Sequence, residues 1–317
     1  MQVIIISHES DLDGIYSASI GLMRYPQAST YFLSYGTESF GKLAKYLQTI
    51  ISSTKMAGIV LISDLGMNDD SNLVEICSKI FDYLEQNNWK ATWIDHHPWP
   101  INVVNTFARR IELVLDDSGN KCAADLMYGY LLKDNVVAAK LASMAHAMDF
   151  FTKEEYLTPV AELIRYYSNF EDFYERLTKL ARKASEGILW DIEMGIEYSH
   201  YVHLRDYEKK ESISSMKIKD VDGIKVVFVK SSRNIQNSLF ADELFSLTKA
   251  DIVMLYNSKG DVSIRRNNDS IACNQIASNL SNGGGHQFAA GASFRSNPLD
   301  VDAVISELEV AIRASLI

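Results

Sequence analysis

Short apolar segments alternate with longer amphipathic segments through the first 150 residues, and this alternation restricts the fold more than any other feature of the chain. The apolar segments are predicted strands: 3–7, 29–34, 58–63, the segment ending at residue 95, and 111–115. The amphipathic segments are predicted helices: 13–24, 38–52, 70–86, 121–132 and 136–149. Strands separated by helices of this length form right-handed βαβ units, so the sequence predicts an α/β domain with a mainly parallel sheet.

The rest of the chain predicts two further regions. Residues 153–215 are mostly helical in pattern, charged and aromatic, and we interpret them as a helical connector. Residues 216–317 return to a mixed α/β pattern, with strands at 224–229, 251–256 and 261–265 and a final helix at 300–314. We therefore expect a metal-binding catalytic domain at 1–152, the connector at 153–215, and a smaller C-terminal domain at 216–317 with the active site in the cleft between the domains.

Charge excludes one class of function. Residues 216–317 contain eleven basic and eleven acidic side chains, so the whole net charge of −10 lies in residues 1–215. A protein with this balance is a poor candidate for binding long duplexes through bulk electrostatics. A short polyanion held by bound metal ions and a few arginines remains compatible with it.

The sequence also predicts a cellular context. No apolar run reaches the roughly 18 residues of a membrane span, so no membrane partner is expected. Residues 1–6 have the pattern of a first strand and lack that of a signal peptide. The three cysteines are too few and too scattered for a disulfide framework, so we expect a reducing, cytoplasmic location.

Polar residues follow the predicted strand that ends at Asp95. The sequence continues with His96 and His97, and prolines at 98 and 100 prevent the strand from going on. In open α/β sheets, ligands bind outside the carboxyl ends of the strands. One carboxylate and two imidazoles at that edge favour a divalent-metal or acid–base site.

Other strand and helix ends bring similar residues. His8, Asp11 and Asp13 follow the first strand, Asp64 follows the third, and Asp149 ends the predicted helix 136–149. Because parallel strands end at one edge, we expect these side chains to meet in one cleft. Crowded carboxylates need protonation or cations to relieve their repulsion, and two divalent ions roughly 3.5–4 Å apart would do so. Helix capping by Asp11 or Asp13 is the alternative interpretation for those two residues.

The pattern resembles the DHH phosphoesterase superfamily, which includes RecJ-type exonucleases, nano-RNases, pAp phosphatases and family II pyrophosphatases. The resemblance rests on His8, Asp11, Asp13, Asp64, Asp95-His96-His97 and Asp149, and on Gly283-Gly284-Gly285-His286 with the residues up to Gly291. The second motif is similar to the glycine-rich motif of the DHH-associated C-terminal domain. It favours the nuclease and nucleotidase branch over the pyrophosphatases. Here His8 lies three residues before Asp11, whereas many members have two.

The resemblance implies a role for each matched residue of the first domain. His8 and Asp11 would hold one ion, Asp13, His96 and Asp149 a second, and Asp64 would bridge the two. Asp95 would orient a ligand histidine, and His97 would contact the substrate phosphate or assist the leaving group. Mixed imidazole and carboxylate ligands favour Mn²⁺, with Mg²⁺, Co²⁺ and Zn²⁺ as alternatives.

The C-terminal domain is expected to bind substrate. Glycines 283–285 let backbone amides approach a phosphate closely, and His286 adds a donor. Arg265, at the end of a predicted strand, matches a family arginine that grips the phosphate. A glycine-lined turn with a packing histidine, and a solvated strand end, are the alternatives.

Two functions follow from these expectations. The first is a Mn²⁺-dependent phosphodiesterase or exonuclease acting on short single-stranded oligonucleotides or related nucleotides, such as nano-RNA, pAp or dinucleotides. The second is a non-catalytic nucleotide-binding or replication-associated scaffold of the same fold. All predicted metal-site positions carry competent residues, which favours the enzyme. A homodimer is left open.

Overall fold

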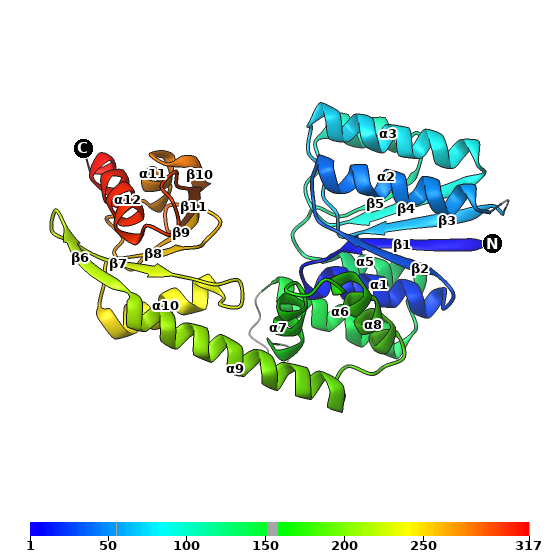
Figure 1. Cartoon of the computed structure of the whole chain (residues 1–317). Coiled ribbons are helices and arrows are strands. Elements are labelled where there is room, and N and C mark those ends of the chain that lie inside the picture. Colours follow the sequence, from blue (N-terminus) through cyan, green and yellow to red (C-terminus); the bar gives the residue numbers. More distant parts are fainter. Residues whose placement is uncertain (55, 151–157, 317) are drawn as a thin grey trace. The chain divides into compact units, whose positions relative to one another are not determined.

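The computed structural model describes residues 1–54, 56–150 and 158–316. The chain forms two compact units, Met1–Tyr198 and Ser199–Ile317 (Figure 1). The predicted α/β class is confirmed, because each unit contains a sheet covered by helices. The two units are described in turn.

A five-stranded parallel sheet forms the centre of the first unit. Its strands are β1 (Gln2–His8), β2 (Ser29–Leu33), β3 (Gly58–Ser63), β4 (Trp89–Asp95) and β5 (Glu112–Leu115). The strand order is β2-β1-β3-β4-β5, so β1, β3 and β4 lie next to one another. Their carboxyl ends therefore share one edge of the sheet, as the alternation of strands and helices predicts.

Helices cover both faces of this sheet (Figure 1). One face carries α1 (Leu12–Arg24), α5 (Ala123–Leu131), α6 (Val136–Asp149) and α8 (Phe173–Ser185), and the other carries α2 (Thr37–Ser52), α3 (Ser71–Gln86) and α4 (Ile101–Phe107). Successive residues of β1 enter different cores, with Ile5 in the first and Ile4 and Ile6 in the second. Burial on both faces explains why the strands are continuous apolar runs.

The predicted connector contains α7 (Thr158–Tyr167), α8 and α9 (Ile192–Ser215). Helix α8 belongs to the first unit, where the hydroxyl oxygens of Thr178 and Thr30 are 2.9 Å apart and Arg182 donates to the carbonyl oxygen of Ala28 at 3.0 Å. The division between the units falls inside α9, after Tyr198. The predicted boundary at 152 lies outside the described residues, and the boundaries at 152 and 215 stay predictions.

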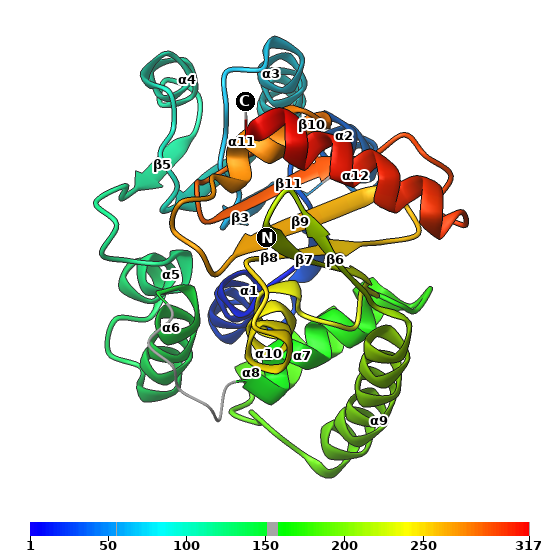
Figure 2. The same cartoon turned by 90° about the vertical axis from the view of Figure 1, so that its left-hand side faces the viewer.

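The second unit is a six-stranded mixed sheet with the order β10-β11-β9-β8-β7-β6. Its strands are β6 (Lys217–Val221), β7 (Ile224–Lys230), β8 (Ile252–Tyr256), β9 (Asp261–Arg266), β10 (Ser281–Gly285) and β11 (Ala289–Ser293). Strands β7 and β8 are parallel, and the other pairs are antiparallel. Helix α10 (Asn237–Thr248) covers one face, while α11 (Cys273–Ser278) and α12 (Val301–Ser315) cover the other (Figure 2).

Several elements were not among the predicted ones: α4, α10, α11, β6, β10 and β11. Strand β6 is an edge strand whose first four residues are exposed, so it has no apolar alternation to detect. Strand β10 reads Ser-Asn-Gly-Gly-Gly, a composition that disfavours strands. Its extended form depends on pairing with β11, which is a tertiary interaction.

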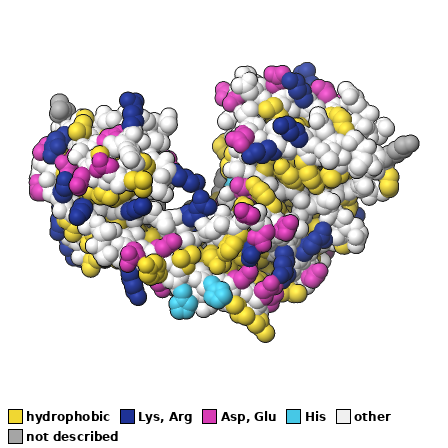
Figure 3. Space-filling view, in the orientation of Figure 1, with side chains coloured by type: hydrophobic (Ala, Val, Ile, Leu, Met, Phe, Trp, Pro, Cys, Tyr) yellow, Lys and Arg dark blue, Asp and Glu magenta, His cyan; other side chains and the backbone are white. Residues whose placement is uncertain are grey.

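On the face of each unit that Figure 3 shows, surface charges of both signs are interspersed. Among the described residues, no helix combines the length and the apolar character that a membrane crossing requires.

Candidate metal centre

The site is built where β1, β3 and β4 end. His8 is the last residue of β1, Asp64 follows β3, and His96 and His97 follow β4. The start of one helix and the end of another complete it, because Asp11 caps α1, Asp13 is in the first turn of α1, and Asp149 is the last residue of α6. The structure thus brings together all predicted ligands of the first unit through one sheet edge and two helix ends.

Asp64 is the central residue. Its backbone has a φ of 57°, in the left-handed region, and its amide donates to the carbonyl oxygen of Ile94 at 3.2 Å. The buried carboxylate places Oδ1 3.5 Å from Nε2 of His96 and Oδ2 3.6 Å from Nδ1 of His8. Within the described part of the chain, Oδ2 accepts no hydrogen bond. A buried carboxylate oxygen without a hydrogen bond is costly, and a bound cation would stabilise it.

His8 and Asp11 form one side of the site. Nδ1 of His8 lies 2.9 Å from Oδ2 of Asp11, while Oδ1 of Asp11 accepts the amide of Gly14 at 3.1 Å. Asp11 therefore caps α1 with one oxygen and faces His8 with the other. A Cβ on Gly14 would lie 2.2 Å from the carbonyl oxygen of His8, so only glycine fits this turn.

Asp13 is held by a different helix. Its Oδ2 and Oδ1 accept the amides of Ala123 and Ala124, at 2.8 and 2.7 Å, in the first turn of α5. Amides in the first helical turn lack partners within their own helix and favour a negative charge. Burial and the nearby Asp64 carboxylate nevertheless raise the pKa of Asp13 well above its ordinary value.

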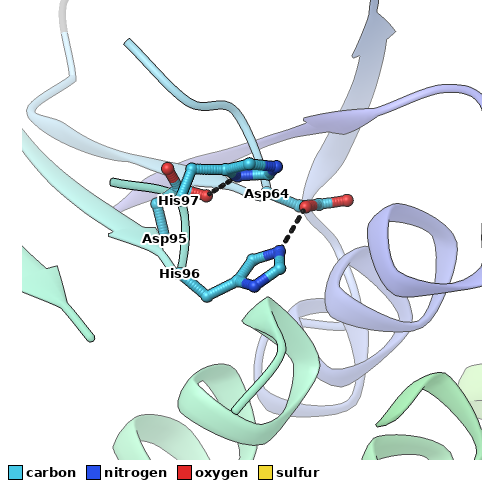
Figure 4. A group of neighbouring side chains, drawn as sticks. All are labelled: Asp64, Asp95, His96 and His97. Carbon is cyan, nitrogen blue, oxygen red and sulfur yellow. Dashed lines mark hydrogen bonds and ion pairs between the residues drawn. The ribbon is translucent and has the colours of Figure 1, made fainter. Parts of the chain in front are cut away.

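His96 lies between three carboxylates. Its Nε2 is 3.6 Å from Oδ2 of Asp13 and 3.5 Å from Oδ1 of Asp64, and its Nδ1 is 3.8 Å from Oδ2 of Asp149. Figure 4 shows the ring of His96 directed toward Asp64. These separations exceed hydrogen-bond lengths, so the groups are adjacent without being bonded to one another.

His97 lies next to His96, with the two ring centroids 4.4 Å apart, and is held by its own partners (Figure 4). Its Nδ1 lies 2.8 Å from Oδ1 of the buried Asp95, whose Oδ2 accepts the indole Nε1–H of Trp99 at 2.7 Å. The hydrogen bond to Asp95 raises the pKa of His97. A Cβ on Gly66 would lie 2.9 Å from Cβ of His97, so glycine at 66 makes room for the imidazole.

Tyr35 was not among the predicted site residues. Its hydroxyl lies 3.4 Å from Nε2 of His97, and its ring centroid is 4.6 Å from that of His8. Tyr35 is the second residue after β2, so it also lies at the carboxyl edge of the sheet, where Asp64 and His96 follow their strands. Burial raises its pKa, and the carboxylates around it act in the same direction, so the phenol stays protonated at neutral pH.

In the metal-free site, protons on two histidines balance part of the negative charge of the carboxylates. Burial opposes protonation of His8, but the carboxylates of Asp11 and Asp64 outweigh it and raise its pKa to about 10. The pKa of His96 is raised to about 9 in the same way, by Asp64, Asp13 and Asp149 against the effect of burial. Two imidazolium groups among carboxylates are the arrangement that metal cations would replace.

The donor set fits divalent metal ions. His8, Asp11 and Asp64 offer one group of nitrogen and oxygen atoms within 4.8 Å of one another, and Asp64, Asp95, His96 and His97 offer another. Asp64 belongs to both groups, and its Oδ2 is the oxygen without a hydrogen bond. Imidazole and carboxylate ligands suit Mn²⁺, Zn²⁺ and Co²⁺.

The predicted substrate-binding residues lie in the second unit. Arg265 on β9 donates to the carbonyl oxygen of Ile264 at 2.9 Å. His286 is exposed, and its ring stacks on that of Phe288 with the ring centroids 5.3 Å apart. The glycines differ in what they contact. A Cβ on Gly283 would lie 1.7 Å from the carbonyl oxygen of Ala277, whereas one on Gly284 would meet nothing within 4 Å.

Two of the three glycines are therefore required by the local fold. Gly283 packs against α11, and Gly285 has a φ of 135° and packs against Ala290 of β11. Gly284 is the position where the absence of a side chain leaves the backbone open to solvent. Of the three predicted phosphate-binding glycines, it is the one that local packing does not explain.

Comparison with known proteins supports the family resemblance expected from the sequence. Residues 222–314 match the DHHA1 domain family, which confirms the resemblance predicted from the glycine-rich motif. The chain is 24% identical over 336 aligned positions to a 3′,5′-cyclic-nucleotide phosphodiesterase of Helicobacter pylori, with 92% of each chain covered.

Among solved structures, the chain resembles a pGpG-specific phosphodiesterase from Vibrio cholerae, with a TM-score of 0.56, 13% identity and coverage of 99% of this chain and 100% of that one. This likeness shows a shared fold. An exopolyphosphatase-related protein from Bacteroides fragilis is similar over 99% of this chain and 93% of that one, with 13% identity and a TM-score of 0.49.

Metal binding is expected to release protons. At pH 7 both His8, with a pKa of about 10, and His96, with a pKa of about 9, carry protons in the metal-free protein. Only neutral imidazole binds metal, so saturation with Mn²⁺ should release about two protons. For the same reason, the affinity for Mn²⁺ should decrease as the pH falls from 8 to 6. Calorimetry in buffers of different ionisation enthalpy measures the number of protons released on metal binding. The exposed-helix variant His200→Gln should release the same number, and Mn²⁺ binding without proton release would contradict the expectation.

Replacing Gly66 should detach His97 from Asp95. In Gly66→Ala the added Cβ, 2.9 Å from Cβ of His97, forces the imidazole to move. Because the hydrogen bond to Asp95 raises the pKa of His97, its loss should lower that pKa in an NMR titration of the metal-free protein. Gly41→Ala is the matched control, since a Cβ there meets nothing within 4 Å. An unchanged titration midpoint in Gly66→Ala would show that the site absorbs the methyl group.

Proposed function

We propose that this chain, whose residues 222–314 match the DHHA1 domain family, hydrolyses phosphodiester bonds in small nucleotides with the help of two divalent metal ions. The observation that carries the proposal is the position of the buried Asp64 carboxylate between two histidines. Its Oδ2 lies toward His8 and its Oδ1 toward His96. Among the described residues, Oδ2 has no hydrogen-bond partner. A bridging ligand needs two separate coordination directions, and this residue offers them.

We propose that His8 and Asp11 hold one ion and that Asp13, His96 and Asp149 hold the other, with Asp64 shared. The proximity of Asp64 to both histidines, and of Asp13 and Asp149 to His96, supports this assignment. When bound, such ions supply Lewis-acid chemistry that activates water near neutral pH and offsets phosphate charge. We propose Mn²⁺ because the ligands mix imidazole and carboxylate groups.

His97 is suited to act as a general acid. Asp95 binds its Nδ1, which leaves Nε2 as the nitrogen that can face a substrate, next to the hydroxyl of Tyr35. The hydrogen bond to Asp95 raises the pKa of His97 and so favours a proton on the ring at neutral pH. We propose that Nε2 donates this proton to the leaving oxygen of the phosphodiester.

The substrate class is proposed from the relatives and the charge balance. The similar proteins are named for a 3′,5′-cyclic nucleotide and for pGpG, which are both small nucleotides. The net charge of −10 also disfavours long duplexes. We therefore propose cyclic mononucleotides, dinucleotides and short single-stranded oligonucleotides as candidates, in a reducing cytoplasm where the three buried cysteines stay free thiols.

In the second unit we propose that Arg265, His286 and the backbone around Gly284 bind substrate phosphate. Arg265 and His286 are cationic or polar donors, and the open backbone at Gly284 allows close approach of an anion. Gly283 and Gly285 would contribute by shaping the strand that carries Gly284.

Replacing Asp64 tests the function. Asp64→Asn keeps the side-chain shape, and asparagine tolerates the left-handed backbone, so the fold should be retained. With Mn²⁺, turnover of 3′,5′-cyclic AMP, pGpG, pAp or a short RNA should fall on the order of 10²- to 10³-fold, as when one charge-stabilising group is lost. Asp69→Asn, exposed in the following loop, should leave the rate unchanged. Failure of the wild-type protein to cleave any of these substrates with Mn²⁺ demonstrably bound would favour a non-catalytic scaffold.

Replacing His286 tests the substrate role of the second unit. Loss of one hydrogen bond to a charged phosphate should raise KM about tenfold or more in His286→Ala. The metal stoichiometry should not change, because His286 is outside the ligand set. His203→Ala on α9 serves as a matched control, since His203 is also exposed. Unchanged KM and kcat in His286→Ala would remove this residue from the site.

A further inference from the structure

Helices α5 and α6 form a hairpin that reaches the site from one end. Residues 132–135 join the two helices at the far end, so the first turn of α5 and the last turn of α6 lie together at the open end. Both turns serve the metal centre. The amides of Ala123 and Ala124 hold both oxygens of Asp13, and Asp149 is the last residue of α6.

One side-chain pair joins these two turns. Nδ1 of His146 lies 2.6 Å from Oδ2 of Asp125, at hydrogen-bond distance. The same oxygen accepts the backbone amide of Cys122 at 3.1 Å, which completes the cap of α5. Asp125 is thus fixed to its own helix and holds the neighbouring one, while His146 is one helical turn before Asp149.

We propose that Asp125 and His146 are positioning residues that set the separation between Asp13 and Asp149, and thereby the affinity of the metal position that these two residues share with His96. The proposal rests on the proposed function, because it assumes that this position binds a metal ion. It goes further by assigning a role to two residues that touch neither substrate nor metal.

The geometry explains why such a pair is needed. Asp13 follows any movement of α5, because both of its oxygens are bonded to that helix. Asp149 follows the last turn of α6, and helix ends fray more readily than helix centres. His96 lies between the two carboxylates, at 3.6 Å from Asp13 and 3.8 Å from Asp149. A tie between the two turns keeps both carboxylates within reach of one ion.

The other metal position provides an internal reference. His8 and Asp11 come from β1 and the start of α1, and their mutual contact of 2.9 Å involves neither α5 nor α6. Loss of the Asp125–His146 pair should therefore weaken one ion selectively. A purely structural role would instead lower the affinity of both positions together with the melting temperature.

The test is Mn²⁺ binding to the full chain, measured by calorimetry and by electron paramagnetic resonance. The wild-type protein should bind two equivalents. In His146→Ala and in Asp125→Asn, one equivalent should bind about tenfold or more weakly, the usual effect of losing a group that orients ligands, while the other is unchanged. His146→Asn, whose amide nitrogen replaces Nδ1, should restore most of the affinity. The exposed-helix variant His203→Ala should match the wild type.

Three results would overturn the proposal. The first is unchanged affinity for both ions in His146→Ala and Asp125→Asn. The second is a wild-type stoichiometry of one ion. The third is a third equivalent that is lost in His146→Ala, because Cys122, Asp125 and His146 would then themselves be a metal site. Failure of the proposed function is distinguishable, since a wild-type protein that binds two ions but cleaves no phosphodiester would refute the activity and leave this inference standing.

Discussion

Repulsion among carboxylates at one sheet edge is the constraint on which the rest of the site depends. Asp13 and Asp64 are buried close to each other, and this burial together with their mutual repulsion raises the pKa of Asp13. The fold offsets part of the cost with the helix amides that bind Asp13 and with the imidazoles of His8 and His96. The remainder calls for cations, which is the physical reason to expect a metal centre.

The backbone around these residues is correspondingly specialised. Asp64 adopts a left-handed conformation, which turns its carboxylate between two imidazoles at the end of β3. Gly14 and Gly66 leave room for the carbonyl group of His8 and the side chain of His97. Strained or glycine-dependent positions of this kind are usually kept where function requires them. The arrangement is therefore organised around the position of a few oxygen and nitrogen atoms.

The hairpin of α5 and α6 adds a second level of control. Its first turn supplies amides for Asp13 and its last turn supplies Asp149, so one supersecondary element determines two ligands of the same position. The contact between Asp125 and His146 lies at the open end of that hairpin, opposite the connection at residues 132–135. Groups that touch no substrate can in this way adjust metal affinity through the helices that carry the ligands.

Much of this protein was determined by local sequence. Alternating strands and helices specify the parallel sheet, strand ends point to Asp64, His96 and His97, and the glycine-rich motif indicates the domain at residues 222–314. These features depend on periodicity and on residue types that lie near one another in the chain. Tertiary structure alone decided the pairing of the glycine strand β10 with β11, the approach of Tyr35 to His97, the binding of Asp13 to α5, and the contact between Asp125 and His146. Each of these joins side chains or strands through packing or hydrogen bonds that form only after the helices and sheets are assembled, and no local pattern records such a contact.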